Sequence, residues 1–260
     1  MSYLGAEVSD GIATITFTSS HNRNSLSCAL LAEMLQAIES FEAREDVRVL
    51  IIRASAGSTV WSSGFNIHEL PESGRDPLSY NDPLECLLRA VQRFPAPVIA
   101  MIEGSVWGGA CDLSFVCDIA IGCQSASFAI TPAKLGVPYN ISGIMHFMNV
   151  VGPRIAREMF YTAEPISADR GLQIGILNHL VPTEELEAFT YGMASRIAQN
   201  SPLANRVMKE QLRLLADAYP LRPETFEYVQ GLRRKVYDSY DYKEGKRAFL
   251  EKRKPVFKGK

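Results

Sequence analysis

The segment from Pro97 to Asp118, PVIAMIEGSVWGGACDLSFVCD, constrains the fold of this chain more than any other part of the sequence. It opens with an uninterrupted apolar run at residues 98–102, which is typical of a strand that is buried on both faces. Glycines end this run, and a mostly apolar segment at residues 110–116 then has helical character. The sequence therefore predicts a buried strand that passes through a glycine turn into a helix.

Two glycines, Gly108 and Gly109, stand at the predicted start of this helix. Glycine lets a ligand approach the backbone closely because it has no Cβ atom, and the first N–H groups of a helix have no partner within it. Such N–H groups can stabilise an oxygen atom that becomes negative during a reaction. A tight turn that only packs a strand against a helix would also use two glycines, so they alone leave both readings open.

The remainder of the chain alternates between strand-like and helix-like segments. Asp10-Gly11 is a turn signal between two alternating runs, which predicts a hairpin, and Ser27 is a candidate helix N-cap. Strands alternating with helices imply an α/β fold with a largely parallel sheet and right-handed crossovers. Strands are expected at residues 3–9, 11–17, 47–53, 119–122 and 126–130, and helices after Ser27, over residues 84–94 and from Pro153 onward.

Two segments lack any periodicity and are predicted to be loops. Residues 71–83, PESGRDPLSYNDP, are rich in turn-forming residues and are expected to form a mobile lid over a site. Residues 131–144, TPAKLGVPYNISGI, form the second predicted loop, in which Tyr139 stands between a proline and an asparagine.

Composition limits the classes of protein that this chain can belong to. Its 260 residues suffice for one large domain, and 47% hydrophobic with 22% charged residues is ordinary for a soluble protein. The net charge of −2 argues against a nucleic-acid-binding protein. No signal peptide or membrane-spanning run is evident. The five cysteines form no CxxC pair and the four histidines are scattered, so we expect a cytoplasmic protein with free thiols and no metal.

A second motif accompanies the glycine segment. VWSSGFNIHEL at residues 60–70 and SVWGGACDLSFVCDIAI at residues 105–121 together resemble the two oxyanion-hole segments of the crotonase (enoyl-CoA hydratase/isomerase) superfamily. LGVPYN, GLQIGILNHLV and AFLEKRKPVF extend the resemblance over nearly the whole chain. Within the superfamily the sequence is most similar to the methylmalonyl-CoA decarboxylases, through HELPESGRDPLSYNDPL, EGSVWGGA and TPAKLGVPYN.

The resemblance implies a fold and an assembly. Residues 1–200 are expected to form the crotonase-like spiral of ββα turns, and residues 201–260 a C-terminal helical region that makes trimer and coenzyme A contacts. The expected assembly is a homotrimer or a dimer of trimers. The partner is an acyl-CoA substrate, and no cofactor is expected beyond the coenzyme A that belongs to the substrate.

The resemblance also implies catalytic residues. The backbone N–H groups of Phe65 and Gly109 would form the oxyanion hole, although the decarboxylases carry histidine at the position of Phe65. The two acid/base glutamates of the hydratases correspond here to Asp112 and Pro132, and proline cannot transfer a proton, so hydration is disfavoured. Tyr139 is the polar side chain that would hold the carboxylate of a malonyl-type substrate, and Asp112 would position water or help to return a proton.

Loss of CO2 needs no base, because the departing carboxylate leaves its electron pair behind as an enolate. The sequence therefore favours decarboxylation of a malonyl-type acyl-CoA, such as methylmalonyl-CoA to propionyl-CoA. Two alternatives stay open: hydration or isomerisation of an enoyl-CoA with Asp112 as the sole base, and a non-catalytic acyl-CoA-binding protein. The residues expected to contact the substrate are Arg23, Ser25, Leu26, Ser63, Asn66, Ile67, Gly108, Thr131, Arg253 and Lys254.

Overall fold

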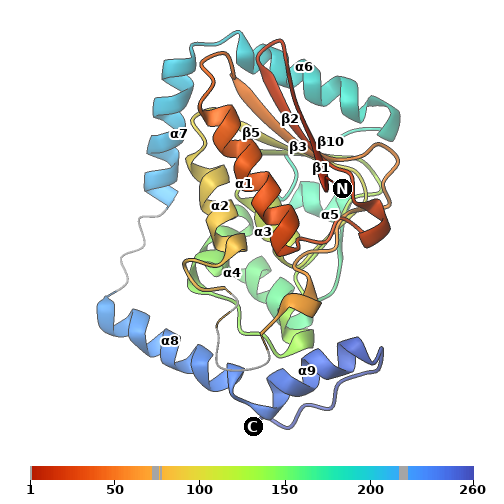
Figure 1. The fold of residues 1–260 in the computed structure, drawn as a ribbon, viewed down its shortest axis with the longest axis vertical. Coiled ribbons are helices and arrows are strands. Elements are labelled where there is room, and N and C mark those ends of the chain that lie inside the picture. The colour runs from red at the N-terminus through yellow and green to blue at the C-terminus, as the bar shows by residue number, and fades with distance from the viewer. Residues whose placement is uncertain (1, 72–75, 77, 217–221) are drawn as a thin grey trace.

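A computed structural model describes residues 2–71, 76, 78–216 and 222–260. Within these residues the strands form two sheets (Figure 1). The larger sheet has the strand order β1-β2-β3-β5-β7-β10 and is parallel except for the hairpin of β1 and β2. Its strands are β1 Leu4–Ser9, β2 Ile12–Phe17, β3 Val49–Ala54, β5 Val98–Ile102, β7 Ile119–Gly122 and β10 His179–Leu180.

The smaller sheet has the order β4-β6-β8-β9, in which only the pairing of β8 with β9 is antiparallel. Three successive turns of the chain each supply a strand to the large sheet, a strand to the small sheet and then a helix. This repeat is the ββα spiral that the sequence predicted. The turns contain β3, β4 Val60–Ser62 and α2 Pro83–Arg93; β5, β6 Ser105–Trp107 and α3 Gly109–Phe115; and β7, β8 Ser127–Ala129 and α4 Ile141–Thr162, with β9 at Ile166–Ser167.

Both faces of the large sheet are covered, which explains its unbroken apolar strands. Side chains alternate along β3, so Leu50 and Ile52 join the main core while Val49 and Ile51 join a second core. Helices α1 (Cys28–Glu42) and α2 lie side by side over one face, and α6 (Leu186–Ala198) covers the other (Figure 1). The Ser27 hydroxyl accepts a hydrogen bond from the Leu30 N–H, so the predicted N-cap is confirmed.

The C-terminal part is helical, with α5 at Ala168–Gln173, α7 at Pro202–Ala216, α8 at Pro223–Tyr237 and α9 at Tyr240–Leu250. Figure 1 shows α8 and α9, in blue, at the end of the molecule away from α6. Short 3-10 helices complete the described structure: η1 Ser20–Asn22, η2 Ile67–Glu69, η3 Pro132–Leu135 and η4 Thr183–Glu185. No helix of the described residues is long and apolar enough to cross a membrane.

The prediction of a loop over residues 131–144 was wrong at its end, because α4 already begins at Ile141. Asn140 is its N-cap and accepts a hydrogen bond from the Gly143 N–H. The helix predicted from Pro153 onward is only the second half of α4, which is kinked at Gly152, where φ is 73°. Of the predicted lid at residues 71–83, residues 72–75 and 77 lie outside the described residues.

Candidate active site

Two loops that leave the small sheet meet at the predicted oxyanion hole. One follows β4 and carries Gly64 and Phe65, and the other follows β6 and carries Gly109. A Cβ atom on Gly64, whose φ is +81°, would lie 3.1 Å from the Trp107 carbonyl carbon and 3.2 Å from the Gly109 nitrogen. A Cβ atom on Gly109 would lie 3.7 Å from the Phe65 nitrogen. The loops are thus in close contact, and this contact requires glycine at position 64.

Hydrogen bonds with Leu26 orient the Phe65 N–H. The Leu26 N–H donates to the Gly64 carbonyl at 2.8 Å, and the Asn66 N–H donates to the Leu26 carbonyl at 3.2 Å. In this parallel bridge the two bonds use the residues on either side of Phe65, so the Phe65 N–H points to the opposite side. Gly109 is the first residue of α3, where an N–H has no partner within the helix. Two N–H groups are therefore available to one ligand oxygen.

A small cavity of about 80 Å³ borders these groups. Phe65, Gly108, Gly109 and Tyr139 line it, and Pro132, at the position of the second hydratase glutamate, lies in its wall. Most other lining side chains are apolar. A negative charge that develops inside the cavity would therefore be stabilised by a small number of fixed N–H and O–H dipoles rather than by water. These apolar residues are Ile67, Leu70, Leu78, Leu84, Ile130, Leu135 and Val137.

Two larger cavities share lining residues with the small one and extend it toward the surface. Ser63 and Ile67 line all three, and Thr131 lines two of them. A cavity of about 550 Å³ reaches Arg23 and Arg253, and one of about 540 Å³ includes Ser25 and Asn66 together with Arg23. The three suit a long ligand with a small apolar head and a polar, anionic tail.

The basic residues predicted for this tail differ in how well they fit. In the described part of the chain Arg23 has no ion pair, so its guanidinium can bind an anion. Arg253 is engaged already: it donates to Glu244 at 2.6 and 3.0 Å and to Glu251 at 2.6 Å. These contacts raise the pKa of Arg253. Lys254 is exposed and lines none of the cavities described above.

Leu26 also differs from its expected place. Its side chain is fully buried in the main core and lines none of these cavities. Only its backbone reaches the site, through the two hydrogen bonds that align the Gly64–Asn66 segment. Leu26 is thus a residue that orients the Phe65 N–H rather than one whose side chain could touch a ligand.

Tyr139 and Asp112 are in direct contact. The Tyr139 hydroxyl donates to Asp112 Oδ2 at 2.8 Å, and Asp112 Oδ1 lies 2.7 Å from Nδ1 of His146 on α4. The Asp112 side chain is fully buried and does not line the small cavity, whereas Tyr139 does. Burial, and then the nearby Asp112 carboxylate, raise the pKa of Tyr139 well above its usual value, so the hydroxyl stays protonated near neutral pH.

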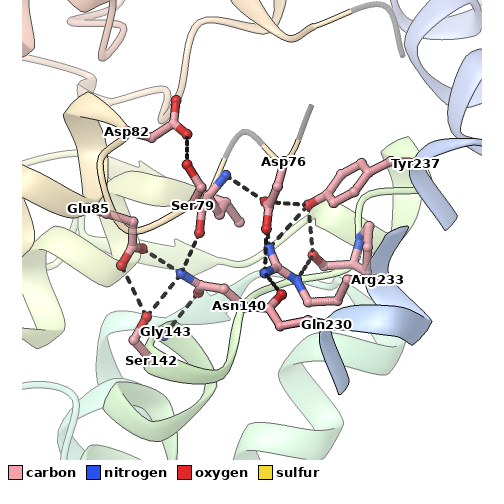
Figure 2. A network of polar contacts seen from close by, with 12 residues as sticks. Asp76, Ser79, Asp82, Glu85, Asn140, Ser142, Gly143, Gln230, Arg233 and Tyr237 are labelled. Atoms are coloured by element: carbon pink, nitrogen blue, oxygen red, sulfur yellow. Dashed lines mark hydrogen bonds and ion pairs between the residues drawn. The ribbon is translucent and has the colours of Figure 1, made fainter. Parts of the chain in front are cut away.

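The start of α4 is anchored by a buried polar network (Figure 2). Glu85 on α2 accepts hydrogen bonds from the Asn140 amide at 2.6 Å and from the Ser142 hydroxyl at 3.0 Å. Burial raises the pKa of Glu85, and the charge of Asp112 adds to this effect. Because Asn140 also caps α4 and adjoins Tyr139, the network fixes the position of the Tyr139 backbone.

A second network ties α8 to the same region (Figure 2). Arg233, which is 4% exposed, donates to both carboxylate oxygens of Asp76, at 2.7 and 2.5 Å. The Tyr237 hydroxyl lies 3.1 Å from the Asp76 carboxylate and 3.3 Å from the Pro138 carbonyl oxygen. Helix α8 therefore supports the residue that immediately precedes Tyr139.

Sequence reasoning missed His146, Glu85 and Asn140 as members of the site. The apolar residues Ile144 and Phe147 are three positions apart, a spacing that is compatible with a helix beginning at Ile141. Recognising that pattern would have placed His146 on a helix near Tyr139. Among the described residues no group of three or more possible metal ligands occurs.

Comparison with known proteins identifies the family to which this fold belongs. A family model described as enoyl-CoA hydratase/isomerase matches residues 7–260. The chain belongs to this family, also called the crotonase family, and the predicted family and fold are confirmed.

Among characterised relatives, the chain is 47% identical to methylmalonyl-CoA decarboxylase of Escherichia coli K12, over 99% of this chain and 98% of the relative. A solved structure of methylmalonyl-CoA decarboxylase in complex with 2-nitronate-propionyl-CoA has a TM-score of 0.97 and 47% identity, and the alignment covers 99% of both chains. A structure of that enzyme with 2S-carboxypropyl-CoA has a TM-score of 0.97 and 46% identity, with 100% of this chain and 99% of the other covered.

Proposed function

We propose that this chain is a carboxy-lyase that converts a malonyl-type acyl-CoA, methylmalonyl-CoA, to propionyl-CoA and CO2. The observation that carries the proposal is the small, mostly apolar cavity, which Phe65, Gly109 and Tyr139 line together with Pro132. The similarity to methylmalonyl-CoA decarboxylase over nearly the whole of both chains supports it.

The thioester oxygen accepts hydrogen bonds from the Phe65 and Gly109 N–H groups. When the carbon–carbon bond to the carboxylate breaks, its electron pair becomes an enolate and the thioester oxygen becomes negative. Two fixed donors in an apolar cavity stabilise that charge, and removal of one such donor typically costs about 3–4 kcal/mol. Because only main-chain N–H groups are required, phenylalanine serves at position 65 as well as histidine.

The apolar wall promotes the loss of CO2. A carboxylate that enters this cavity exchanges water for side chains such as Leu84 and Ile130, so its charge is poorly solvated and the neutral product CO2 is favoured. Tyr139 contacts the carboxylate and turns it out of the thioester plane, so that the breaking bond aligns with the π system of the carbonyl. Asp112 acts through Tyr139, since its carboxylate contacts that hydroxyl and does not line the cavity.

The coenzyme A portion occupies the two outer cavities. Arg23 is the proposed phosphate ligand because it lines both cavities and forms no ion pair with a described residue. Ser25, Ser63, Asn66 and Thr131 supply polar groups along the way. No further cofactor takes part in this scheme, because coenzyme A arrives with the substrate.

The proposed assembly is a homotrimer or a dimer of trimers. Helices α7 and α8 carry several large apolar side chains that are exposed to solvent. These include Leu203 at 72%, Leu212 at 68%, Leu215 at 72% and Tyr228 at 67% exposure. Monomeric soluble proteins rarely expose large apolar patches. Light scattering at micromolar concentration is expected to give three or six times the monomer mass, and a monomer would contradict the proposal.

A panel of acyl-CoA substrates tests the function. Mass spectrometry should detect propionyl-CoA and CO2 from methylmalonyl-CoA, and negligible hydration of crotonyl-CoA, since Pro132 cannot transfer a proton. Tyr139→Phe should slow CO2 release about ten- to a hundredfold, from loss of one hydrogen bond to a charged group worth about 1.5–3 kcal/mol. Binding of propionyl-CoA, which has no carboxylate, should hardly change. Efficient hydration without CO2 release would overturn the proposal, and acyl-CoA binding with neither reaction would indicate a non-catalytic protein.

A further inference from the structure

The hydrogen bond between Tyr139 and Asp112 is part of a longer chain that connects two cavities. Tyr139 lines the acyl cavity, whereas His146 lines a separate cavity of about 260 Å³ between α4 and α7. Asp112 lies between them, with Oδ2 2.8 Å from the Tyr139 hydroxyl and Oδ1 2.7 Å from His146 Nδ1. The Asp112 side chain is fully buried, so these contacts form a path through the protein interior.

Gln92 extends the path to the second cavity, which it lines together with His146. Its amide nitrogen lies 3.0 Å from Nε2 of His146. In this orientation the amide donates to a neutral imidazole whose Nδ1–H donates to Asp112. An amide carries both a donor and an acceptor, and a half-turn of its terminal group would offer its oxygen to a protonated Nε2. Gln92 is thus a suitable partner for a histidine that changes its protonation state.

Decarboxylation requires one proton per turnover, because the enolate must be protonated at the carbon that loses CO2. Among the described residues that line the acyl cavity, Tyr139 is the hydroxyl bonded to a buried carboxyl group. In the function proposed above Tyr139 holds the departing carboxylate, which brings its hydroxyl close to the new carbanion. Resting on the function proposed above, we propose that His146 and Asp112 supply this proton to the enolate through Tyr139.

Each turnover delivers one proton to the substrate carbon and takes up one proton from water. Before the reaction Asp112 carries a proton on Oδ2 and donates it to the Tyr139 oxygen, so that the tyrosine proton faces the substrate. After CO2 leaves, the O–H bond of Tyr139 breaks as a C–H bond forms, and the Asp112 proton passes to Tyr139. Asp112 is then a carboxylate that accepts from both Tyr139 and His146, as in the structure. A water proton taken up at His146 Nε2 releases the Nδ1 proton to Asp112 Oδ1, which leaves a protonated carboxyl group and the Nε2–H tautomer of His146. A half-turn of the carboxyl group presents its proton to the Tyr139 oxygen, and tautomer exchange of His146 with water restores the first state.

The charged and titratable groups around His146 in the described part of the chain include Asp112 on α3, Glu85 on α2, and Asp118, Lys209 and Arg213, which line the second cavity with it. Lys209 and Asp118 form an ion pair at 2.7 Å. These groups remain when His146 alone is substituted, so loss of an inflection from a pH profile would report on His146 itself.

His146→Asn tests the relay, because asparagine can still donate an N–H to Asp112 Oδ1 but cannot be protonated. In rapid-quench experiments with methylmalonyl-CoA, this variant should release one CO2 per site at the wild-type rate. Turnover should then continue at least tenfold more slowly, with a larger solvent isotope effect and without the inflection in the pH profile of kcat. His146→Gln, whose amide can likewise donate to Asp112 but cannot be protonated, should show the same burst if His146→Asn does not fold. His179→Asn, at an exposed histidine of β10, is the matched control and should behave as wild type.

Steady-state kinetics of folded His146→Asn, or of folded His146→Gln, that match wild type with an unchanged pH profile would overturn the relay. A slowed first turnover would also overturn it, because His146 would then only hold Tyr139 in position for the loss of CO2. Absence of CO2 release by the wild-type protein would instead refute the proposed function, and the relay with it. The wild-type and variant measurements therefore separate the two failures.

Discussion

The position of the Tyr139 ring depends on the absence of a side chain at Gly143. A Cβ atom on Gly143 would lie 2.7 Å from Tyr139 Cδ1 and closer still to Cε1, and 2.7 Å from the Asn140 side-chain oxygen. Carbon atoms in contact normally lie about 3.5–4.0 Å apart, so in Gly143→Ala the ring must move by about 1 Å. A shift of that size in a positioning group can lower a rate about a hundredfold.

The expected result for Gly143→Ala is a fall in kcat for methylmalonyl-CoA of about 10- to 100-fold, with little change in the affinity for propionyl-CoA. Overpacking should also cost about 1–3 kcal/mol of stability. Gly192→Ala in α6 is the matched control: the nearest atom to its Cβ would be 3.8 Å away, so activity should be unchanged and stability should rise by about 0.5–1 kcal/mol. A folded Gly143→Ala variant with wild-type kcat would refute the claim that the ring position controls the reaction.

Three further changes test other parts of the structure. Gly109→Pro removes one proposed oxyanion donor at the first position of α3, where proline is tolerated, so kcat should fall about 10²–10³-fold with an unchanged circular dichroism spectrum; retained turnover would contradict the assignment. Arg233→Leu leaves the partly buried Asp76 carboxylate unpaired and should lower the free energy of unfolding in urea by about 1–3 kcal/mol; an unchanged midpoint would count against this. The contacts with Arg253 lower the pKa of Glu244, so their stabilisation of the folded state is complete above the ordinary glutamate pKa of about 4.3 and declines as pH falls from there toward the depressed pKa of the folded state. Residues 253–260 should then become sensitive to an acid protease, and equal resistance at pH 3 and pH 6 would argue otherwise.

The fold was predictable because its signals are local. The apolar runs of β3, β5 and β7 are each buried on both faces, and the periods of α1 and α2 match their amphipathic packing. The contact between the loops of Phe65 and Gly109 followed from family motifs. Strands β4 and β6 have only three residues each, which is too short for an alternating pattern to stand out.

The polar network around Tyr139 could not be predicted in the same way. Asp112 meets His146 across 34 positions of sequence, and Asn140 meets Glu85 across 55, because stacking of the spiral turns brings them together. Gly143 lowers helix propensity, yet it lies in α4 and makes room for Tyr139.

The basic residues predicted to bind phosphate differ in whether they already have a partner within the chain. The family resemblance implied phosphate contacts for Arg253 and Lys254, but neither resemblance nor charge reveals whether a partner is already present. Glu244, 2% exposed, and Glu251 bind Arg253 within the chain. Arg23, which stands in a polar loop without other basic residues, has no ion pair among the described residues and lines both outer cavities.

Whether the Phe65 and Gly109 N–H groups bind the thioester oxygen is tested most directly by isotope-edited infrared spectroscopy of propionyl-CoA labelled at its carbonyl group. Two hydrogen bonds in an apolar cavity polarise the carbonyl, so its stretching band should move to lower frequency on binding to the wild-type protein. In Gly109→Pro, which has one donor fewer, the band should lie between its frequency in the wild-type complex and its frequency in free solution. A bound carbonyl that absorbs at its frequency in free solution would contradict stabilisation of the enolate by this pair of N–H groups.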